Sequence, residues 1–239
     1  MAENLIEKGD ASAVIKRVIV SIVVLGLMMA GCAKPQNDGS VPADSQNSAV
    51  ETVEKETVRK ILPLPDTTME NLTDAILAVS LEAGGAYVDE NGNMQMAVTV
   101  YTYDQYDMVD ISMLHVGDTI VRHSGEVEVT SKEQNEAGTI HINGGLDNDG
   151  FNLVTDDSGI FYEMGYGDSK NWYAIGNVTL PLSADFTGVD NADLDYRDLA
   201  LTADSFLTGE VTNYDFTPYN TTIRVENGQV VELERRYTP

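Results

Sequence analysis

The chain has 239 residues, 42% of them hydrophobic, which is enough for one globular domain of ordinary size or two small ones. Its formal net charge of -25 makes nucleic acid and anionic lipid surfaces unfavourable partners, because both would repel it. The single cysteine excludes an intrachain disulfide and a cluster of thiolate metal ligands. The composition therefore indicates an acidic protein that does not bind nucleic acid.

The amino-terminal part of the chain has the pattern of an export signal. Lys16 and Arg17 precede an apolar run over residues 18–30 that only Ser21 and Gly26 interrupt. This run is too short for a comfortable membrane span, but it has the length of a signal-peptide core. The alternative is an uncleaved anchor or a buried helix that ends in a cysteine by chance.

The run ends in Met29-Ala30-Gly31-Cys32, where one large apolar residue and two small ones precede the only cysteine of the chain. This sequence resembles the lipobox of bacterial lipoproteins. The resemblance implies that signal peptidase II removes residues 1–31 and that the thiol of Cys32 carries diacylglycerol. We therefore expect a lipid-anchored protein on the extracytoplasmic face of the cell membrane, with the lipid bilayer as the partner of Cys32.

A polar segment separates this signal from the folded part. Residues 32–64 contain few large apolar side chains, so we expect a disordered linker that begins at the lipidated cysteine. Residues 65–239 are expected to form a β-rich globular domain. This region resembles the uncharacterised extracytoplasmic lipoproteins of Gram-positive bacteria, a resemblance that implies no activity.

Short β-type runs separated by Gly, Asn and Asp turns dominate the domain. The clearest covers residues 94–103, where valine, threonine and tyrosine alternate as in a half-buried strand. Further strands are expected over residues 78–82, 119–123, 126–131, 138–142, 159–163 and 172–180. Short helices are expected after a cap at Asp66 or Thr67, over residues 107–114 and over residues 203–207. The pattern predicts an all-β fold with minor helix, either an antiparallel sandwich or a barrel.

The last hairpin is expected over residues 222–237. Four of its apolar residues are odd-numbered: Ile223, Val225, Val231 and Leu233. They can share one face only if the loop between the strands has an odd number of residues. A three-residue loop from Glu226 to Gly228 satisfies this condition, with Gly228 in the left-handed conformation of a bulge.

Two patterns contain residue types that bind metals. His123 and His141 fall on predicted strands and would share a zinc ion only if those strands were neighbours, so solvated or singly hydrogen-bonded histidines are favoured. Asp147 and Asp149 lie in a glycine-containing acidic turn and are the first candidates for calcium. However, Ser158 stands where a calcium-hand loop needs its closing glutamate, and a solvated turn is favoured there as well.

The sequence shows no catalytic signature that we recognise. It lacks a Gly-x-Ser-x-Gly nucleophile elbow, a Ser-x-x-Lys pair and a glycine-rich phosphate loop. Glu126 and Glu128 share one face of a predicted strand, as the carboxylates of a glycosidase could, but such a pair is usually a wet surface. The sequence therefore favours a non-enzymatic protein without an organic cofactor.

Aromatic residues give the strongest binding signal. Tyr103, Tyr166, Trp172 and Tyr173 are the candidate binding residues, because glycine-spaced aromatic side chains near acids can form a sugar- or peptide-binding surface. Strand alternation requires roughly half of such residues to be core residues. We expect a non-enzymatic binding or structural domain whose ligand is a protein, a peptide or a glycan. A calcium-dependent module or a carboxylate-using envelope hydrolase is the alternative.

Overall fold

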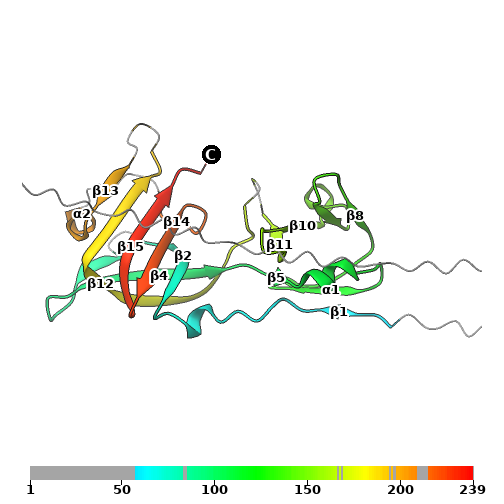
Figure 1. Ribbon diagram of the computed structural model, residues 1–239, viewed down its shortest axis with the longest axis horizontal. Coiled ribbons are helices and arrows are strands. Elements are labelled where there is room, and N and C mark those ends of the chain that lie inside the picture. Colours follow the sequence, from blue (N-terminus) through cyan, green and yellow to red (C-terminus); the bar gives the residue numbers. More distant parts are fainter. Residues whose placement is uncertain are drawn as a thin grey trace, which may run out of the picture. The chain divides into compact units, whose positions relative to one another are not determined.

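The computed structural model describes residues 57–82, 85–165, 167, 169–193, 195, 198–208 and 215–238. Strands dominate these residues, and the two α-helices, Met108–Ser112 (α1) and Ala203–Thr208 (α2), are short (Figure 1). The predicted all-β fold with minor helix is therefore confirmed. Among the described residues, none of the helices has the length and apolar character that a membrane span requires. Cys32 and the predicted signal peptide lie outside the described residues.

The largest sheet closes on itself. Its order is β13-β12-β15-β14-β2-β4-β3, and an additional pairing joins β12 to β4. The seven strands are β2 (Ala75–Ser80), β3 (Ala86–Val88), β4 (Met94–Thr102), β12 (Tyr173–Asn191), β13 (Leu199–Leu201), β14 (Thr221–Glu226) and β15 (Gln229–Arg236). The first half of β12 runs antiparallel to β4 and its second half runs parallel to β15, so this bent strand closes a ring of β12, β15, β14, β2 and β4 (Figure 1).

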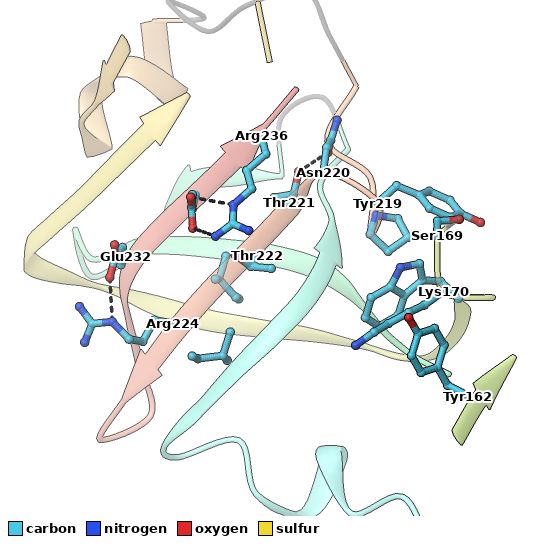
Figure 2. Close-up of a pocket in the computed structure, with 15 residues that line it drawn as sticks. Tyr162, Ser169, Lys170, Tyr219, Asn220, Thr221, Thr222, Arg224, Glu232 and Arg236 are labelled. Carbon is cyan, nitrogen blue, oxygen red and sulfur yellow. Dashed lines mark hydrogen bonds and ion pairs between the residues drawn. The ribbon is translucent and has the colours of Figure 1, made fainter. Parts of the chain in front are cut away.

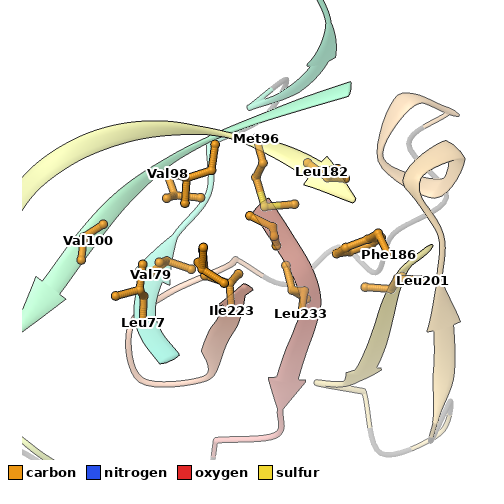
Figure 3. Packing of buried hydrophobic residues seen from close by; sticks show 13 residues of the cluster. Leu77, Val79, Met96, Val98, Val100, Leu182, Phe186, Leu201, Ile223 and Leu233 are labelled. Atoms are coloured by element: carbon orange, nitrogen blue, oxygen red, sulfur yellow. The ribbon is translucent and has the colours of Figure 1, made fainter. Parts of the chain in front are cut away.

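The inside of this ring is the first hydrophobic core. Alternate residues of each strand point inward, as in β4, where Met96, Val98 and Val100 are buried and the residues between them are not. Side chains from five further strands complete the core (Figure 3): Leu77, Val79, Leu180, Leu182, Phe186, Leu201, Ile223, Val225, Val230 and Leu233. The other face of β14 and β15 is therefore free to carry polar side chains.

A buried ion pair joins β12 to β15 beside this core. Asp190 lies opposite Arg235 in the parallel register, and both side chains are 0% exposed. Arg235 Nε donates to Asp190 Oδ1 at 2.9 Å, and a second guanidinium nitrogen donates to Oδ2. The guanidinium carbon also lies 3.8 Å from the centre of the Phe216 ring. The pair thus ties together the two strands that meet where the sheet closes.

The remaining strands enclose a second core. One sheet has the order β1-β6-β7 and the other has the order β5-β11-β10-β9-β8. Their strands are β1 (Lys60–Ile61), β5 (Gln105–Tyr106), β6 (Thr119–Arg122), β7 (Gly125–Glu128), β8 (Lys132–Gln134), β9 (Ile140–Ile142), β10 (Phe151–Thr155) and β11 (Phe161–Met164). The core comprises Ile61, Tyr106, Ile111, Leu114, Ile120, Val129, Ile140, Ile142, Phe151, Leu153 and Phe161.

Helix α1 lies within the segment where a short helix was expected, and its Ile111 is part of this second core. Asp107 caps its amino terminus by accepting a hydrogen bond from the backbone N–H of Val109 at 2.7 Å. At the other end, Lys132 Nζ donates to the carbonyl oxygens of Ile111 at 2.8 Å and Leu114 at 3.1 Å. The helix expected after Asp66 is shorter than predicted, because only the 3₁₀ turn Thr68–Glu70 (η1) forms there.

The folded chain begins before the predicted boundary at residue 65. Lys60–Ile61 (β1) pairs in parallel with β6, Ile61 is buried, and the backbone N–H of Leu64 donates to the carbonyl of Gln105 at 2.7 Å. The predicted linker over residues 32–64 is therefore too long at its carboxyl end. Composition did not reveal this start of the domain, because the two-residue strand β1 buries a single apolar side chain, Ile61.

The turn of the last hairpin differs from the prediction. Asn227 and Gly228 form a two-residue turn with both φ angles positive, at 51° and 74°. The extra residue is a bulge inside β15 and does not belong to the turn. The register pairs Arg224 with Glu232 and Val225 with Val230, so Val231 has no partner in the pairing. The buried face consequently contains Val230 rather than Val231.

Candidate binding site

An open groove of about 490 Å³ lies against the outer face of β14 and β15 (Figure 2). Its size falls within the range of roughly 300–1,000 Å³ that is typical of ligand sites. Three segments that are far apart in the sequence supply its lining. These are Ile76 of β2; Tyr162, Ser169, Lys170 and Trp172 around the end of β11; and Pro218 to Arg224 with Glu232, Glu234 and Arg236 from the last hairpin.

The floor of the groove carries arginine–glutamate pairs. Arg224 Nε donates to Glu232 Oε2 at 2.8 Å across the two strands, and Arg224 also pairs with Glu226. Arg236 donates from two nitrogens to Glu234, each at 2.8 Å. The hydrogen bonds from Arg236 lower the pKa of Glu234, and the hydrogen bond to Glu232 raises the pKa of Arg224. Glu234 and Arg224 therefore stay charged, and each of the two arginines is paired with at least one glutamate.

One wall of the groove is aromatic. The ring of Tyr103 meets Trp172 edge to face at a centroid distance of 4.9 Å, and it meets Tyr162 in the same manner at 5.7 Å. Lys170 Nζ donates to the hydroxyl of Tyr103 at 2.7 Å and lies 5.6 Å from the centre of the Trp172 ring. Trp172 and Tyr162 are half-buried, so each ring offers part of its surface to the groove.

Glu163 fixes the segment that carries this wall. Its buried carboxylate accepts hydrogen bonds from Arg122 Nε at 2.7 Å and from Asn171 Nδ2 at 2.7 Å. The backbone N–H of Asn171 also donates to the carbonyl of Glu163 at 3.1 Å. Asn171 lies between Lys170 and Trp172, so one carboxylate on β11 holds both groove residues in place.

The loop before β14 forms another part of the rim, where Tyr219 lies beside Ser169 (Figure 2). The Asn220 side chain accepts a hydrogen bond from Thr217 N–H at 3.0 Å and donates to the carbonyl of Asp215 at 3.1 Å, which closes the loop. This geometry presents Tyr219, which is 50% exposed. The groove therefore combines an aromatic wall and an exposed tyrosine on its rim with a polar floor of paired charges.

The four predicted binding residues do not form a single site. Tyr103 and Trp172 are in contact, and Trp172 lines the groove. Tyr173 faces the other way, because its hydroxyl donates to the buried Asp104 at 3.0 Å and its ring stacks on His123. Burial and the negative charge of Asp104 raise the pKa of Tyr173 above its ordinary value. Tyr166 lies outside the described residues.

Tyr173 and Tyr103 line a second open cavity of about 510 Å³ on that other side. Its remaining walls come from the chain between β1 and β2, including Asp66 and Asp74, from the start of β2 and from Asp104 and Gln105. The Asp66 carboxylate is already used locally, since it accepts a hydrogen bond from Thr68 N–H at 2.8 Å. The described residues that line this cavity include no arginine–glutamate pair like those on the floor of the groove.

The structure separates the two histidines that were considered for zinc. His141 lies on β9, where Nδ1 is 2.8 Å from Asn152 Oδ1, whereas His123 follows β6 in another sheet and stacks on Tyr173. The strands are not neighbours, so the condition for a shared zinc ion is not met.

The proposed calcium ligands fall in an exposed turn. Asp147 belongs to the 3₁₀ turn Leu146–Asn148 (η2), and Asp149 follows it in the left-handed conformation at φ 60°. Within the part of the chain that the structure describes, no group of three or more His, Cys, Asp or Glu side chains is placed to hold a metal ion.

The sequence patterns missed the charged half of the groove. These residues are even-numbered members of the last hairpin that point away from the core: Thr222, Arg224, Glu232, Glu234 and Arg236. The alternation that identified the buried face also predicts this outward face, but it does not show which other segment lies over it. No family model matches the chain, and no match is found among curated proteins or solved structures.

Proposed function

We propose that this protein is a lipid-anchored, non-enzymatic binding protein of the extracytoplasmic membrane face, and that the groove on β14 and β15 is its ligand site. One observation supports the binding function: aromatic side chains and paired polar charges line the same open groove. Such combinations of apolar surface and a few oriented polar groups are typical of ligand sites.

The acids of the groove suit binding better than catalysis. A general acid needs a carboxyl group whose pKa is raised towards neutrality. Glu234 has the opposite property, because its hydrogen bonds to Arg236 lower its pKa. Glu232 is held by Arg224. Both side chains are therefore arranged as fixed hydrogen-bond acceptors.

The anchoring part of the proposal rests on the sequence around Cys32. Diacylglycerol supplies two acyl chains, and two hydrophobic anchors are what stable membrane attachment requires. The net charge of -25 makes direct adhesion of the domain to anionic lipid unfavourable, so a covalent anchor would be needed to keep it at the surface.

Replacing Cys32 by alanine should abolish lipid attachment. In a bacterial host fed an alkyne-labelled fatty acid, we expect the unchanged chain to incorporate the label and Cys32→Ala to lose it at least tenfold, because the thiol is the proposed acceptor. Mass spectrometry of the purified chain should show a diacylglycerol adduct on an amino-terminal Cys32. The variant Ser21→Ala, inside the apolar run, should be labelled normally. An intact Met1 with an unmodified thiol in the unchanged chain would contradict the anchor.

Ligand binding should change the fluorescence of Trp172. This residue is the only tryptophan of the chain, and it lines the groove, so its emission reports the occupancy of the site directly. We expect saturable emission changes when the full chain in detergent is titrated with at least one of two pools, a mixture of neutral oligosaccharides or a mixture of random hexadecapeptides. Free tryptophan amide is the control for inner-filter effects. A flat titration with both pools would count against the groove as a binding site.

A further inference from the structure

Resting on the proposed binding function, we infer that the ligand of the groove is a neutral glycan rather than a peptide or an anionic polymer. Three features of the groove lead to this ligand class: the position of its floor strands in the sheet, the pairing of its charges, and the aromatic surfaces beside its floor.

The floor offers side chains but no free strand edge. β14 lies between β15 and β2, and β15 lies between β12 and β14, so each of the two strands is paired along both edges. An extended peptide is usually gripped by main-chain hydrogen bonds to an exposed edge strand. The groove cannot provide this mode of binding, because its floor strands have used their backbone groups within the sheet.

The charges of the floor are compensated before any ligand binds. Arg224 pairs with Glu226 and Glu232, and Arg236 pairs with Glu234. An anionic ligand would have to displace these carboxylates and would also approach a chain with a formal net charge of -25. Lys170 also lines the groove, where its Nζ donates to the hydroxyl of Tyr103. Because the two described arginines of the groove are already paired with glutamates, electrostatics favours a neutral ligand over a polyanion.

Sugar hydroxyl groups match such a floor. A hydroxyl both donates and accepts, so it can donate to a glutamate and accept from an arginine without removing either charge from its partner. The Arg224–Glu232 and Arg236–Glu234 pairs lie along the same hairpin, with the hydroxyl of Thr222 and the Asn220 amide beside them (Figure 2). The floor thus presents repeated donor and acceptor groups to a chain of rings.

The aromatic residues suit the other surface of a sugar. A pyranose ring has an apolar face of C–H groups that packs on an aromatic ring, and burial of that face adds hydrophobic stabilisation. Trp172 and Tyr162 line one side of the groove, and Tyr219 stands on its rim with half of its surface exposed. Several aromatic contacts beside a polar floor fit a short stretch of neutral oligosaccharide.

The test compares three probes on the full chain in detergent, by Trp172 emission and by titration calorimetry. The first is a mixture of neutral hexasaccharides of glucose, mannose and N-acetylglucosamine, the second is oligogalacturonate, and the third is a random hexadecapeptide mixture. We expect saturable binding of a neutral hexasaccharide, binding of oligogalacturonate at least tenfold weaker, and no saturable response to the peptides.

A matched pair of tyrosine variants locates the site. Tyr219→Ala should weaken the binding of the neutral hexasaccharide about fivefold to tenfold, which is the loss of one aromatic contact. Tyr87→Ala removes a tyrosine of similar exposure, 41%, from the edge strand β3 and should leave affinity within twofold. Equal effects of the two variants would overturn the assignment to this groove.

The outcomes separate the ligand class from the proposed function. Saturable peptide binding that Tyr219→Ala weakens, without glycan binding, would overturn the glycan inference and leave the binding function standing. Oligogalacturonate that binds as tightly as the neutral sugars would overturn the argument from paired charges. If none of the three probes changes the emission or produces heat, both the inference and the groove's binding function are wrong.

Discussion

Asp190→Ala is expected to lower the free energy of unfolding by about 3–5 kcal/mol, which is the usual cost of breaking a buried ion pair from one side. Asp190 and Arg235 are both 0% exposed, so the variant would remove from the interior the carboxylate that accepts two hydrogen bonds from this guanidinium. The same substitution removes the acceptor of the Ala192 N–H, which donates to Asp190 Oδ1 at 3.0 Å. Urea denaturation followed by far-ultraviolet circular dichroism measures the loss.

Two further variants show whether burial of the charge is the cause. Replacing both partners by apolar residues, Asp190→Leu with Arg235→Met, should recover most of the lost stability, because neither charge of the buried pair remains in the interior. Glu126→Ala breaks the exposed pair with Lys60, whose side chains are 53% and 59% exposed, and should cost less than about 1 kcal/mol. If Asp190→Ala and Glu126→Ala lower the free energy of unfolding equally, burial of the charge is not the cause.

The alternation of apolar and polar residues was sufficient to predict strands that bury one face along their whole length. Met94–Thr102 (β4) alternates buried and less buried residues along its length, as its valines and threonines indicated. Tyr173–Asn191 (β12) is different, since only its first half was predicted. Its second half contains proline, glycine and aspartate, and it is extended because β15 and β13 pair with it. The partner changes close to Pro181, which pairs with Gln95 of β4, while Leu182 pairs with Val230 of β15.

The candidate site was also predictable only in part, because the strand pattern is local and the contact with the last hairpin is not. Trp172 and Tyr173 are adjacent, so a strand must direct them to opposite sides, and the sequence predicted that half of the aromatic residues would not serve the site. It could not show which half, because Trp172 meets the groove only where the last hairpin lies beside it. Arg224 and Glu232 had no signal of function by themselves, since paired charges on an outward face are usually a solvated surface.

Glu163→Ala is expected to lower the free energy of unfolding by about 3 kcal/mol, because the carboxylate is only 4% exposed and holds two partners. The variant would leave the guanidinium of Arg122 over the Phe151 ring, at 4.4 Å from its centre, without its carboxylate. It would also free the Asn171 side chain, which precedes Trp172. We therefore expect a red shift of the Trp172 emission of the folded variant, in addition to a lower urea midpoint.

Two comparisons separate the loss of position from the loss of stability. Glu163→Gln keeps one carbonyl oxygen for Asn171 but removes the charge that pairs with Arg122, so its stability should fall while its Trp172 emission stays close to that of the unchanged protein. Glu133→Ala, at an exposed glutamate of the same sheet, should change neither quantity by a measurable amount. If Glu163→Ala loses stability and its folded state keeps the unchanged emission, Glu163 supports the second core alone. The wall of the groove would then be held by the contacts that Trp172 and Lys170 make with Tyr103.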